Sequence, residues 1–418
     1  MYKVYFKQAL HILKQDRLIS AISIIGTALA ITMIMLVYMV QEVKTANVLP
    51  EIHRDRSMYL NMMDIKYNTG GRWRAMLKYE ALKECLLPLK TPENISATVM
   101  LTDAVVNMEG SAERNTYQLR QTDDNFWKIY SFPFTEGKAF TKEDFDSGIP
   151  VVVISQKIAK EIFKGQQAVG KTIDINFIPY KVLGVVKNIS MLCRYSFADL
   201  WIPYTSVPSY TNSMYNFVAL AKHKNDFDAI KEEVLVNQKK YNAIDTTRVL
   251  DLNGPYTVSQ MLLDIYSSED AANEIKANTR RNILILVIAL IIPAINLSSF
   301  SLSRIRKRMS EIGVRKAFGA NKFSLIGQVL YENMITSLIG GALGFILSFI
   351  AVVSLRDLLL SDSLSVLQSG EFGLSMSAFF SLSVFLAVFL ACIALNVLSA
   401  SIPAFRASRL PIVNALKS

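Results

Sequence analysis

Cysteine is scarce in this 418-residue chain, and its three copies, Cys85, Cys193 and Cys392, are far apart in the sequence. Their number and spacing exclude a disulfide framework and a cysteine-based metal site. Cys85 and Cys193 leave two interpretations open, a pair formed in an oxidising compartment or two free thiols. The sequence predicts no catalytic residue, no metal and no cofactor bound by this chain.

Charge is also limited, since charged residues make up 19% of the chain and hydrophobic residues 51%, with a mean hydropathy of +0.28. Such a composition exceeds what a soluble surface tolerates. The apolar residues are concentrated, and Leu18 to Val40 contains no charged side chain. At about 1.5 Å per residue, a helix of this length crosses the hydrocarbon core of a bilayer. A cleaved signal peptide would have a shorter apolar region and a small-residue cleavage site, which this segment lacks.

Three further apolar spans are predicted near the other end of the chain, at residues 283–302, 331–355 and 374–402. The fold class is therefore an integral membrane protein with four transmembrane helices and a large extracytoplasmic domain between the first and second. Pro293 predicts a kink in the second span, because a transmembrane helix accepts proline when neighbouring groups satisfy the freed carbonyl.

Lysine and arginine gather in three segments, residues 1–17, 303–323 and 403–418, although the whole chain carries only +10. Because cytoplasmic loops carry such an excess, we expect both termini and the second loop to be cytoplasmic. Residues 44–276 are then extracytoplasmic. The basic residues flank helices and form no aromatic-interleaved groove, so nucleic-acid binding is not expected.

The extracytoplasmic domain mixes helical and strand periodicity, which predicts an α+β fold. Helices are expected at residues 79–87, 155–164, 226–240 and 259–276, the last leading into the second span. Strands are expected at 117–121, 151–154, 172–177, 180–186 and 217–221. The third and fourth of these strands are predicted to form a hairpin that turns at Ile178 and Pro179.

One segment, Gly165 to Thr172, matches the phosphate-loop pattern G-x-x-x-x-G-K-[ST] letter for letter. A phosphate loop needs a strand before it and a helix after it, so that backbone N–H groups converge on the phosphate. Here the predicted order is reversed, with a helix before and a hairpin after. We therefore interpret the segment as a structural turn.

Three segments in order resemble the MacB/FtsX-like permease family of ABC transporters. They are residues 123–189, which resemble a MacB-type periplasmic domain; the cytoplasmic run RKRMSEIGVRKAFGA at 306–320; and the tail PAFRASRLPIVNALK at 403–417. Asn414 departs from the family pattern, in which an acidic residue is common. The resemblance implies that the extracytoplasmic domain has a part near the membrane and a distal part, the latter at about residues 106–214.

The loop after the second span carries an apolar stripe at helical spacing flanked by cations. By itself this pattern fits an interfacial helix on anionic lipid equally well. The resemblance favours a coupling helix, at 303–323, that docks into a cytosolic ATPase. The candidate coupling residues are Arg308, Glu311, Ile312, Gly313, Arg315, Lys316 and Gly319.

Small residues mark places where membrane helices approach closely. Gly340 and Gly344 form G-x-x-x-G in the third span, and Gly26 with Ala30 forms a looser version in the first. These pairs could serve packing within one subunit or between two.

The resemblance implies a permease subunit of an ABC transporter in the bacterial inner membrane, with its large domain in the periplasm. A separate cytosolic ATPase would bind and hydrolyse ATP, and this chain would not be an enzyme. A second permease subunit and membrane lipid are expected partners, with a periplasmic adaptor and an outer-membrane channel as further candidates. Transport would proceed by mechanotransmission to the extracytoplasmic domain. The alternative is an FtsX-like signalling protein that regulates an extracytoplasmic enzyme.

Overall fold

The chain divides into two compact units in the computed structural model. The helical unit comprises Met1–Val43, Thr279–Val366 and Phe379–Ser418, and the globular unit comprises Lys44–Asn278 and Leu367–Ala378. The structure describes residues 17–67, 70–108, 114–191, 193–244, 247–261, 273–285, 287, 288, 291, 314, 318 and 322–360, and separate positions between 385 and 405.

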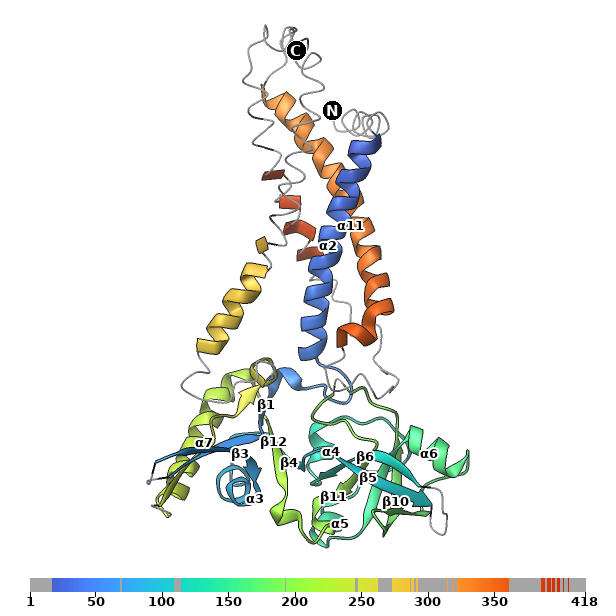
Figure 1. Cartoon of the computed structure of the whole chain (residues 1–418), viewed down its shortest axis with the longest axis vertical. Coiled ribbons are helices and arrows are strands. Elements are labelled where there is room, and N and C mark those ends of the chain that lie inside the picture. Colours follow the sequence, from blue (N-terminus) through green and yellow to red (C-terminus); the bar gives the residue numbers. More distant parts are fainter. Residues whose placement is uncertain are drawn as a thin grey trace. The chain divides into compact units, whose positions relative to one another are not determined.

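The helical unit is built on two long helices, α2 (Arg17–Thr45) and α11 (Lys322–Leu360) (Figure 1). Among the described residues, one helix is long and apolar enough to cross a membrane, at Met334–Ala351, and a shorter apolar stretch lies at Ser20–Leu36. Both segments fall within spans predicted from the sequence. Most of the residues predicted to form the second and fourth spans lie outside the described part.

The globular unit alternates strands and short helices. Its first half contains η1 (Arg54–Arg56), β1 (Ser57–Leu60), β2 (Met62–Tyr67), β3 (Arg72–Lys78), α3 (Tyr79–Ala81), η2 (Leu82–Leu86), β4 (Asn94–Val99), β5 (Thr102–Met108), β6 (Asn115–Thr122), α4 (Phe126–Ile129), β7 (Phe134–Gly137) and α5 (Lys142–Asp146). Its second half contains β8 (Val151–Ser155), α6 (Gln156–Phe163), β9 (Thr172–Ile175), β10 (Ile178–Val186), β11 (Leu200–Pro203), η3 (Tyr204–Ser206), η4 (Tyr210–Asn212), β12 (Met214–Leu220), η5 (Lys224–Asp226), α7 (Phe227–Asn242), β13 (Arg248–Asp251), β14 (Tyr256–Thr257) and α8 (Val258–Met261).

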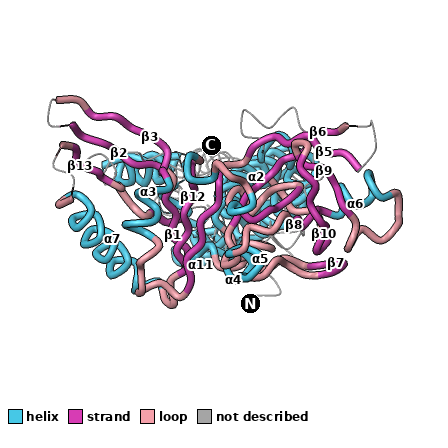
Figure 2. The backbone as a smooth tube through the Cα atoms, turned by 90° about the horizontal axis from the view of Figure 1, so that it is seen from below, coloured by secondary structure: helices cyan, strands magenta, loops and turns pink. Residues whose placement is uncertain are grey.

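The strands form one 14-stranded sheet, part of which closes on itself. The path β11-β8-β10-β9-β5-β6 ends where β6 pairs with β11, so these strands make a barrel. Closing a sheet removes its free edges, which otherwise template pairing with other chains. Beyond the barrel the sheet continues through β4 into β12, β3, β2 and β13. The last four of these strands are labelled in Figure 2.

The barrel interior is filled by alternate residues of its strands, as the two-residue period of a strand dictates. These are Ala104, Val106, Tyr117, Leu119, Val152, Ile154, Ile173, Ile175, Tyr180, Val182, Leu200 and Ile202. Strand β8 is buried on both faces, since Val151 and Val153 join a second core around Trp201. That burial explains its uninterrupted run of β-branched residues.

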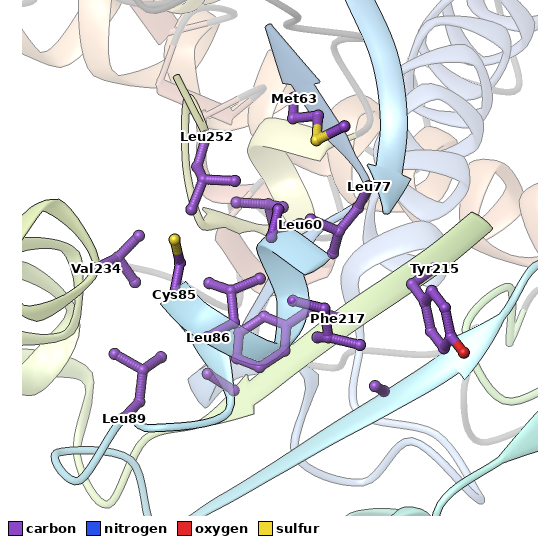
Figure 3. Close-up of a cluster of buried hydrophobic side chains, with 14 of the residues drawn as sticks. Leu60, Met63, Leu77, Cys85, Leu86, Leu89, Tyr215, Phe217, Val234 and Leu252 are labelled. Carbon is purple, nitrogen blue, oxygen red and sulfur yellow. The ribbon is translucent and has the colours of Figure 1, made fainter. Parts of the chain in front are cut away.

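Strands β1–β4 and β12–β14 form a second part of the globular unit, whose core lies between the sheet and two helical segments (Figure 3). Leu60, Leu77, Tyr215 and Phe217 project from the strands, while Leu86 and Val234 come from η2 and α7. Residues 102–203, which include all the barrel strands, are inserted between β4 and β12 of this second part. The inserted segment lies close to the range predicted for the distal part, 106–214.

The predicted elements of the globular unit correspond closely to the structure. The predicted helices at 79–87, 155–164 and 226–240 match α3 with η2, α6 and α7, and each predicted strand overlaps an observed one. The helix predicted at 259–276 begins as α8, but its middle lies outside the described residues. Both ends of the helix at 155–164 are capped. The Ser155 side chain accepts a hydrogen bond from the Ile158 N–H at the start, and the backbone of Lys164 adopts the left-handed conformation that ends the helix.

The hairpin prediction is correct in its strands but wrong in its turn. The turn lies at Asn176 and Phe177, with φ of 51° and 69°, and Pro179 is within β10 opposite Asp174. Two positive φ values give the tight turn whose twist suits a hairpin, and asparagine adopts them readily. The Asn176 N–H and side-chain oxygen also bond the backbone of Val105, both at 2.9 Å. These bonds hold the turn two residues before the predicted position at Ile178 and Pro179.

Candidate functional site

The G-x-x-x-G pair of α11 lies against α2. A Cβ atom added at Gly340 would stand 2.8 Å from the Thr27 Cβ, and one at Gly344 would stand 2.7 Å from the Ala28 carbonyl oxygen. Both distances are shorter than van der Waals contact, so only glycine fits without a shift of one helix. The pair thus packs within one chain in this structure.

A hydrogen bond reinforces this contact, because the Thr32 hydroxyl donates to the Gly344 carbonyl oxygen at 3.1 Å as well as to the Ala28 carbonyl of its own helix at 2.8 Å. The other predicted pair differs. A Cβ at Gly26 would meet no described atom within 4 Å, and Ala30 is half-buried. The neighbouring Gly341 faces the ring of Phe389 instead, so α11 packs on two sides.

The predicted coupling residues, Arg308, Glu311, Ile312, Gly313, Arg315, Lys316 and Gly319, all lie outside the described residues. Two positions of the same segment are described, Val314 and Phe318. The Phe318 N–H donates to the Val314 carbonyl at 3.1 Å, which is the i→i−4 bond of an α-helical turn. Val314 is 45% exposed and Phe318 is 89% exposed. Two apolar side chains four residues apart therefore share one exposed face.

The loop that matches the phosphate-binding pattern connects α6 to β9, in the order predicted for a structural turn. Its Lys171 ammonium donates to the Gln166 side-chain oxygen at 2.6 Å and lies 5.4 Å from the centre of the Phe163 ring. Ala168, in the middle of the loop, is fully buried in the barrel core. The loop follows the C-terminal end of α6 and leads into β9, so its backbone N–H groups do not lead into a helix as those of a phosphate loop do.

A buried polar cluster lies directly after α2 in the chain and was not predicted from the sequence. The Arg54 Nε–H donates to Glu51 at 2.6 Å, and each of these two side chains is 1% exposed. The other Glu51 oxygen accepts from the Tyr195 N–H at 3.1 Å, the Ser196 N–H at 2.9 Å and the Ser196 hydroxyl at 2.8 Å. These bonds join residues 144 and 145 positions apart.

The electrostatics of the cluster follow from its burial. Burial alone would lower the pKa of Arg54, but the Glu51 carboxylate raises it above its ordinary value. Burial and the Glu51 charge raise the pKa of the nearby Cys193 thiol well above its usual range, so this thiol stays protonated. Burial likewise lowers the pKa of Arg120 to about 10. Cys85 and Cys193 are both buried and free, which excludes a disulfide between them in this structure.

A second buried carboxylate, Asp123, joins the barrel to the adjoining strand β4. It accepts from the Ser96 hydroxyl at 2.6 Å, the Ala97 N–H at 2.8 Å and the Phe126 N–H at 2.9 Å. Burial raises its pKa to about 7 against the opposing effect of these three donors.

Sequence reasoning missed these carboxylates because each one meets residues distant in the chain. For Glu51 the local signal is its i, i+3 spacing from Arg54 immediately after the first apolar span. That spacing is common on exposed surfaces and does not indicate that the two side chains are buried.

The features described above define a class: a chain with long apolar helices and a separate α+β domain. Residues 20–235 match the MacB-like periplasmic core domain, and residues 283–412 match the FtsX-like permease C-terminal domain. The first match covers more than half of the chain. The chain belongs to the MacB/FtsX-like permease family, and its large domain is periplasmic in type.

Two relatives illustrate the similarity. One is an uncharacterized ABC transporter permease, YknZ, of Bacillus subtilis (strain 168), 26% identical over 61% of this chain and 62% of the relative. The other is a macrolide export ATP-binding/permease protein, MacB, of Shewanella sp. (strain W3-18-1), 23% identical over 99% of this chain and 60% of the relative. The chain thus spans less than two thirds of the length of either relative.

Two solved structures also match. The periplasmic region of MacB from Actinobacillus actinomycetemcomitans is 17% identical, with a TM-score of 0.35, and the match covers 50% of this chain and 94% of that structure. A domain of a putative permease protein from Porphyromonas gingivalis is 14% identical, with a TM-score of 0.38, over 49% of this chain and 91% of that structure.

Proposed function

We propose that this chain is the permease subunit of an ABC transporter and couples ATP hydrolysis by a separate cytosolic subunit to export from the extracytoplasmic side. The observation that carries the proposal is the succession of a MacB-like periplasmic core and an FtsX-like permease domain in one chain. The relatives include a permease matched over 61% of this chain and an ATP-binding/permease protein matched over 99% of it.

In this proposal the chain has four transmembrane helices, with both termini and the loop at 303–323 in the cytoplasm. The positive charge of residues 1–17, 303–323 and 403–418 supports that orientation. The chain lies in the inner membrane and pairs with a second permease subunit. A periplasmic adaptor and an outer-membrane channel are further proposed partners.

The chain itself is proposed to be non-catalytic, with ATP bound by the partner. The one sequence match to a phosphate loop supports this view, because it lies after a helix, with its lysine bonded to Gln166. A phosphate loop of this pattern gathers backbone N–H groups at the N-terminus of the helix that follows it, whereas here the loop is followed by strand β9.

The coupling segment is proposed to dock into the ATPase through an apolar ridge flanked by cations. Val314 and Phe318 would insert into an apolar groove of the partner, and the predicted coupling residues would surround them. Burying an aromatic side chain contributes about 1.5–3 kcal/mol. A phenylalanine that is 89% exposed has most of that contribution still to gain.

A co-purification experiment tests this docking. Membranes carrying the tagged wild-type chain or Phe318→Ser are solubilised, and the ATPase recovered with each is quantified. We expect at least tenfold less ATPase with Phe318→Ser, since a loss of about 1.4 kcal/mol already lowers affinity tenfold. Ile244→Ser is the matched control, because Ile244 is 83% exposed and lies in the globular unit.

A charge-reversal pair extends the test to the predicted cations. Arg315→Glu should release the ATPase, because an unpaired carboxylate buried against a partner costs on the order of 2–5 kcal/mol. Lys307→Glu, which reverses a cation of the same loop outside the predicted coupling residues, controls for surface charge, since a helix resting on lipid loses only about 1 kcal/mol per basic residue. Equal recovery of the ATPase with Phe318→Ser, Arg315→Glu and the wild type would contradict the docking proposal.

The size of the globular unit favours transport over the FtsX-like signalling alternative. A signalling protein of that kind would have a much smaller extracytoplasmic domain, whereas here the unit runs from Lys44 to Asn278. Substrate would be handled by this domain outside the membrane, and amphiphilic drugs, peptides and lipoproteins are the candidate cargoes.

A further inference from the structure

The segment that follows α2 is closed into a compact loop by its own side chains. The Arg54 guanidinium donates to the carbonyl of Ala46, the residue that follows the last residue of α2, at 3.1 Å. The Asn47 side chain exchanges two hydrogen bonds with Asp55, at 2.9 and 3.1 Å. Because both ends of residues 46–55 are tied together, this loop resists extension when either end is displaced.

The loop is attached to the barrel by Glu51. As described above, this carboxylate accepts three hydrogen bonds from Tyr195 and Ser196, which lie between β10 and β11. A further bond runs from the Ser131 N–H to the Pro50 carbonyl at 2.9 Å. The Tyr59 and Tyr195 rings also stack, with centroids 3.9 Å apart.

The receiving segment is itself fixed to barrel strands. Arg120 of β6 donates to the carbonyls of Arg194, at 3.0 Å, and Phe197, at 2.9 Å. The indole N–H of Trp201, in β11, donates to the Ser196 carbonyl at 3.0 Å. A displacement of Glu51 therefore reaches β6 and β11, the two strands whose pairing closes the barrel.

The end of α2 is thus connected to the strands of the globular unit in two ways. The covalent route leads through η1 into β1, which pairs with β12 outside the barrel. The second route leads through Arg54 and Glu51 to the barrel. We propose that Glu51 and Arg54 are positioning residues that transmit movement of α2 to the barrel.

This role explains the chemistry of the cluster better than stability does. A buried ion pair is weak evidence for stability, since apolar residues of similar volume often stabilise a fold as well or better. An apolar pair could not hold two backbone N–H groups and a hydroxyl in a fixed direction, whereas a carboxylate does so. The proposal rests on the proposed function, because it requires ATP-driven movement of α2.

Distance measurements on the full chain in complex with its co-purified ATPase test the proposal. Spin labels are attached at Lys160→Cys on α6 and Lys239→Cys on α7, two exposed positions in the barrel part and the second part. The native Cys85 and Cys193 are buried, and Cys392→Ser removes the third cysteine. Distances are recorded without nucleotide and after trapping with ATP and vanadate.

We expect the wild-type distance to change on trapping and the Glu51→Gln distance to stay unchanged, while ATP hydrolysis remains within about twofold. The matched control is Glu93→Gln, which removes the carboxylate of a more exposed pair that Arg56 forms at 2.5 Å. This control should respond as the wild type does. A Glu51→Gln complex that responds like the wild type would overturn the transmission role while leaving the proposed function intact.

A wild-type complex that hydrolyses ATP without any change in distance would also overturn this inference, whereas the proposed function fails if no ATPase co-purifies with the wild-type chain. Arg54→Lys and Ser196→Ala provide milder variants should Glu51→Gln fail to fold. Each removes part of the Glu51 network and should reduce the nucleotide-dependent change at an unchanged temperature of unfolding. A full response in both milder variants would also overturn the proposal.

Discussion

The contact between α2 and α11 gives the sharpest test of the helical unit. Replacing Gly344 by alanine places a methyl group 2.7 Å from the Ala28 carbonyl oxygen and 2.9 Å from the Ile31 Cβ. Carbon atoms in contact are normally about 3.5–4.0 Å apart, so the helices must separate or distort. Overpacking of this kind costs about 1–3 kcal/mol.

A matched variant isolates that cost from helix propensity. Alanine is favoured over glycine within a helix by about 1 kcal/mol wherever the substitution is made. Gly327→Ala lies on the same helix, and there the new methyl group meets no described atom within 4 Å. The difference in free energy of unfolding between Gly344→Ala and Gly327→Ala should therefore be about 1–3 kcal/mol.

The measurement is denaturation of the purified full chain by increasing SDS in mixed micelles, followed by far-ultraviolet circular dichroism. Gly340→Ala should behave as Gly344→Ala does, since its methyl group would stand 2.8 Å from the Thr27 Cβ. Gly26→Ala should follow Gly327→Ala, because a methyl group at Gly26 would meet no described atom within 4 Å. If all four variants are equally stable, the packing described here is wrong.

Three further outcomes are expected. Burial raises the pKa of Asp123 to about 7, above an unfolded value of about 3.9; its contribution to stability is therefore present at low pH and lost as pH rises through 7. Thermal unfolding of the full chain should show about 1 kcal/mol less stability at pH 8 than at pH 6, and Asp123→Asn should remove that difference. Lys171→Ala should leave ATP hydrolysis by the assembled complex within about twofold, and a tenfold loss would restore the phosphate-loop interpretation. Cys85 and Cys193, both buried with raised pKa values, should react with iodoacetamide at neutral pH only after unfolding, as mass spectrometry of the alkylated chain would show.

The local sequence pattern was sufficient to predict most helices and strands of the globular unit. The helix α6 was predictable because the apolar residues of 155–164 recur at helical spacing. The hairpin was predictable as a hairpin, but its turn was not, since the Val105 bonds that favour Asn176 come from a strand far away in sequence. Pro179 is the stronger local signal for the position of the turn. Here the hydrogen bonds between Asn176 and Val105 place the turn elsewhere.

The sequence by itself determined that this chain has apolar helices, an α+β domain between them and the motifs of a permease family, because periodicity, hydropathy and short motifs are properties of neighbouring residues. The closure of the barrel and the partners of Glu51 were decided only by tertiary structure. The nearest ends of β6 and β11, Thr122 and Leu200, have 77 residues between them. The sequence pattern within either strand does not indicate that the two strands pair. Burial of a carboxylate is likewise a property of everything that surrounds it. The same glutamate in the same sequence pattern would be a solvated surface residue if Tyr195 and Ser196 were elsewhere.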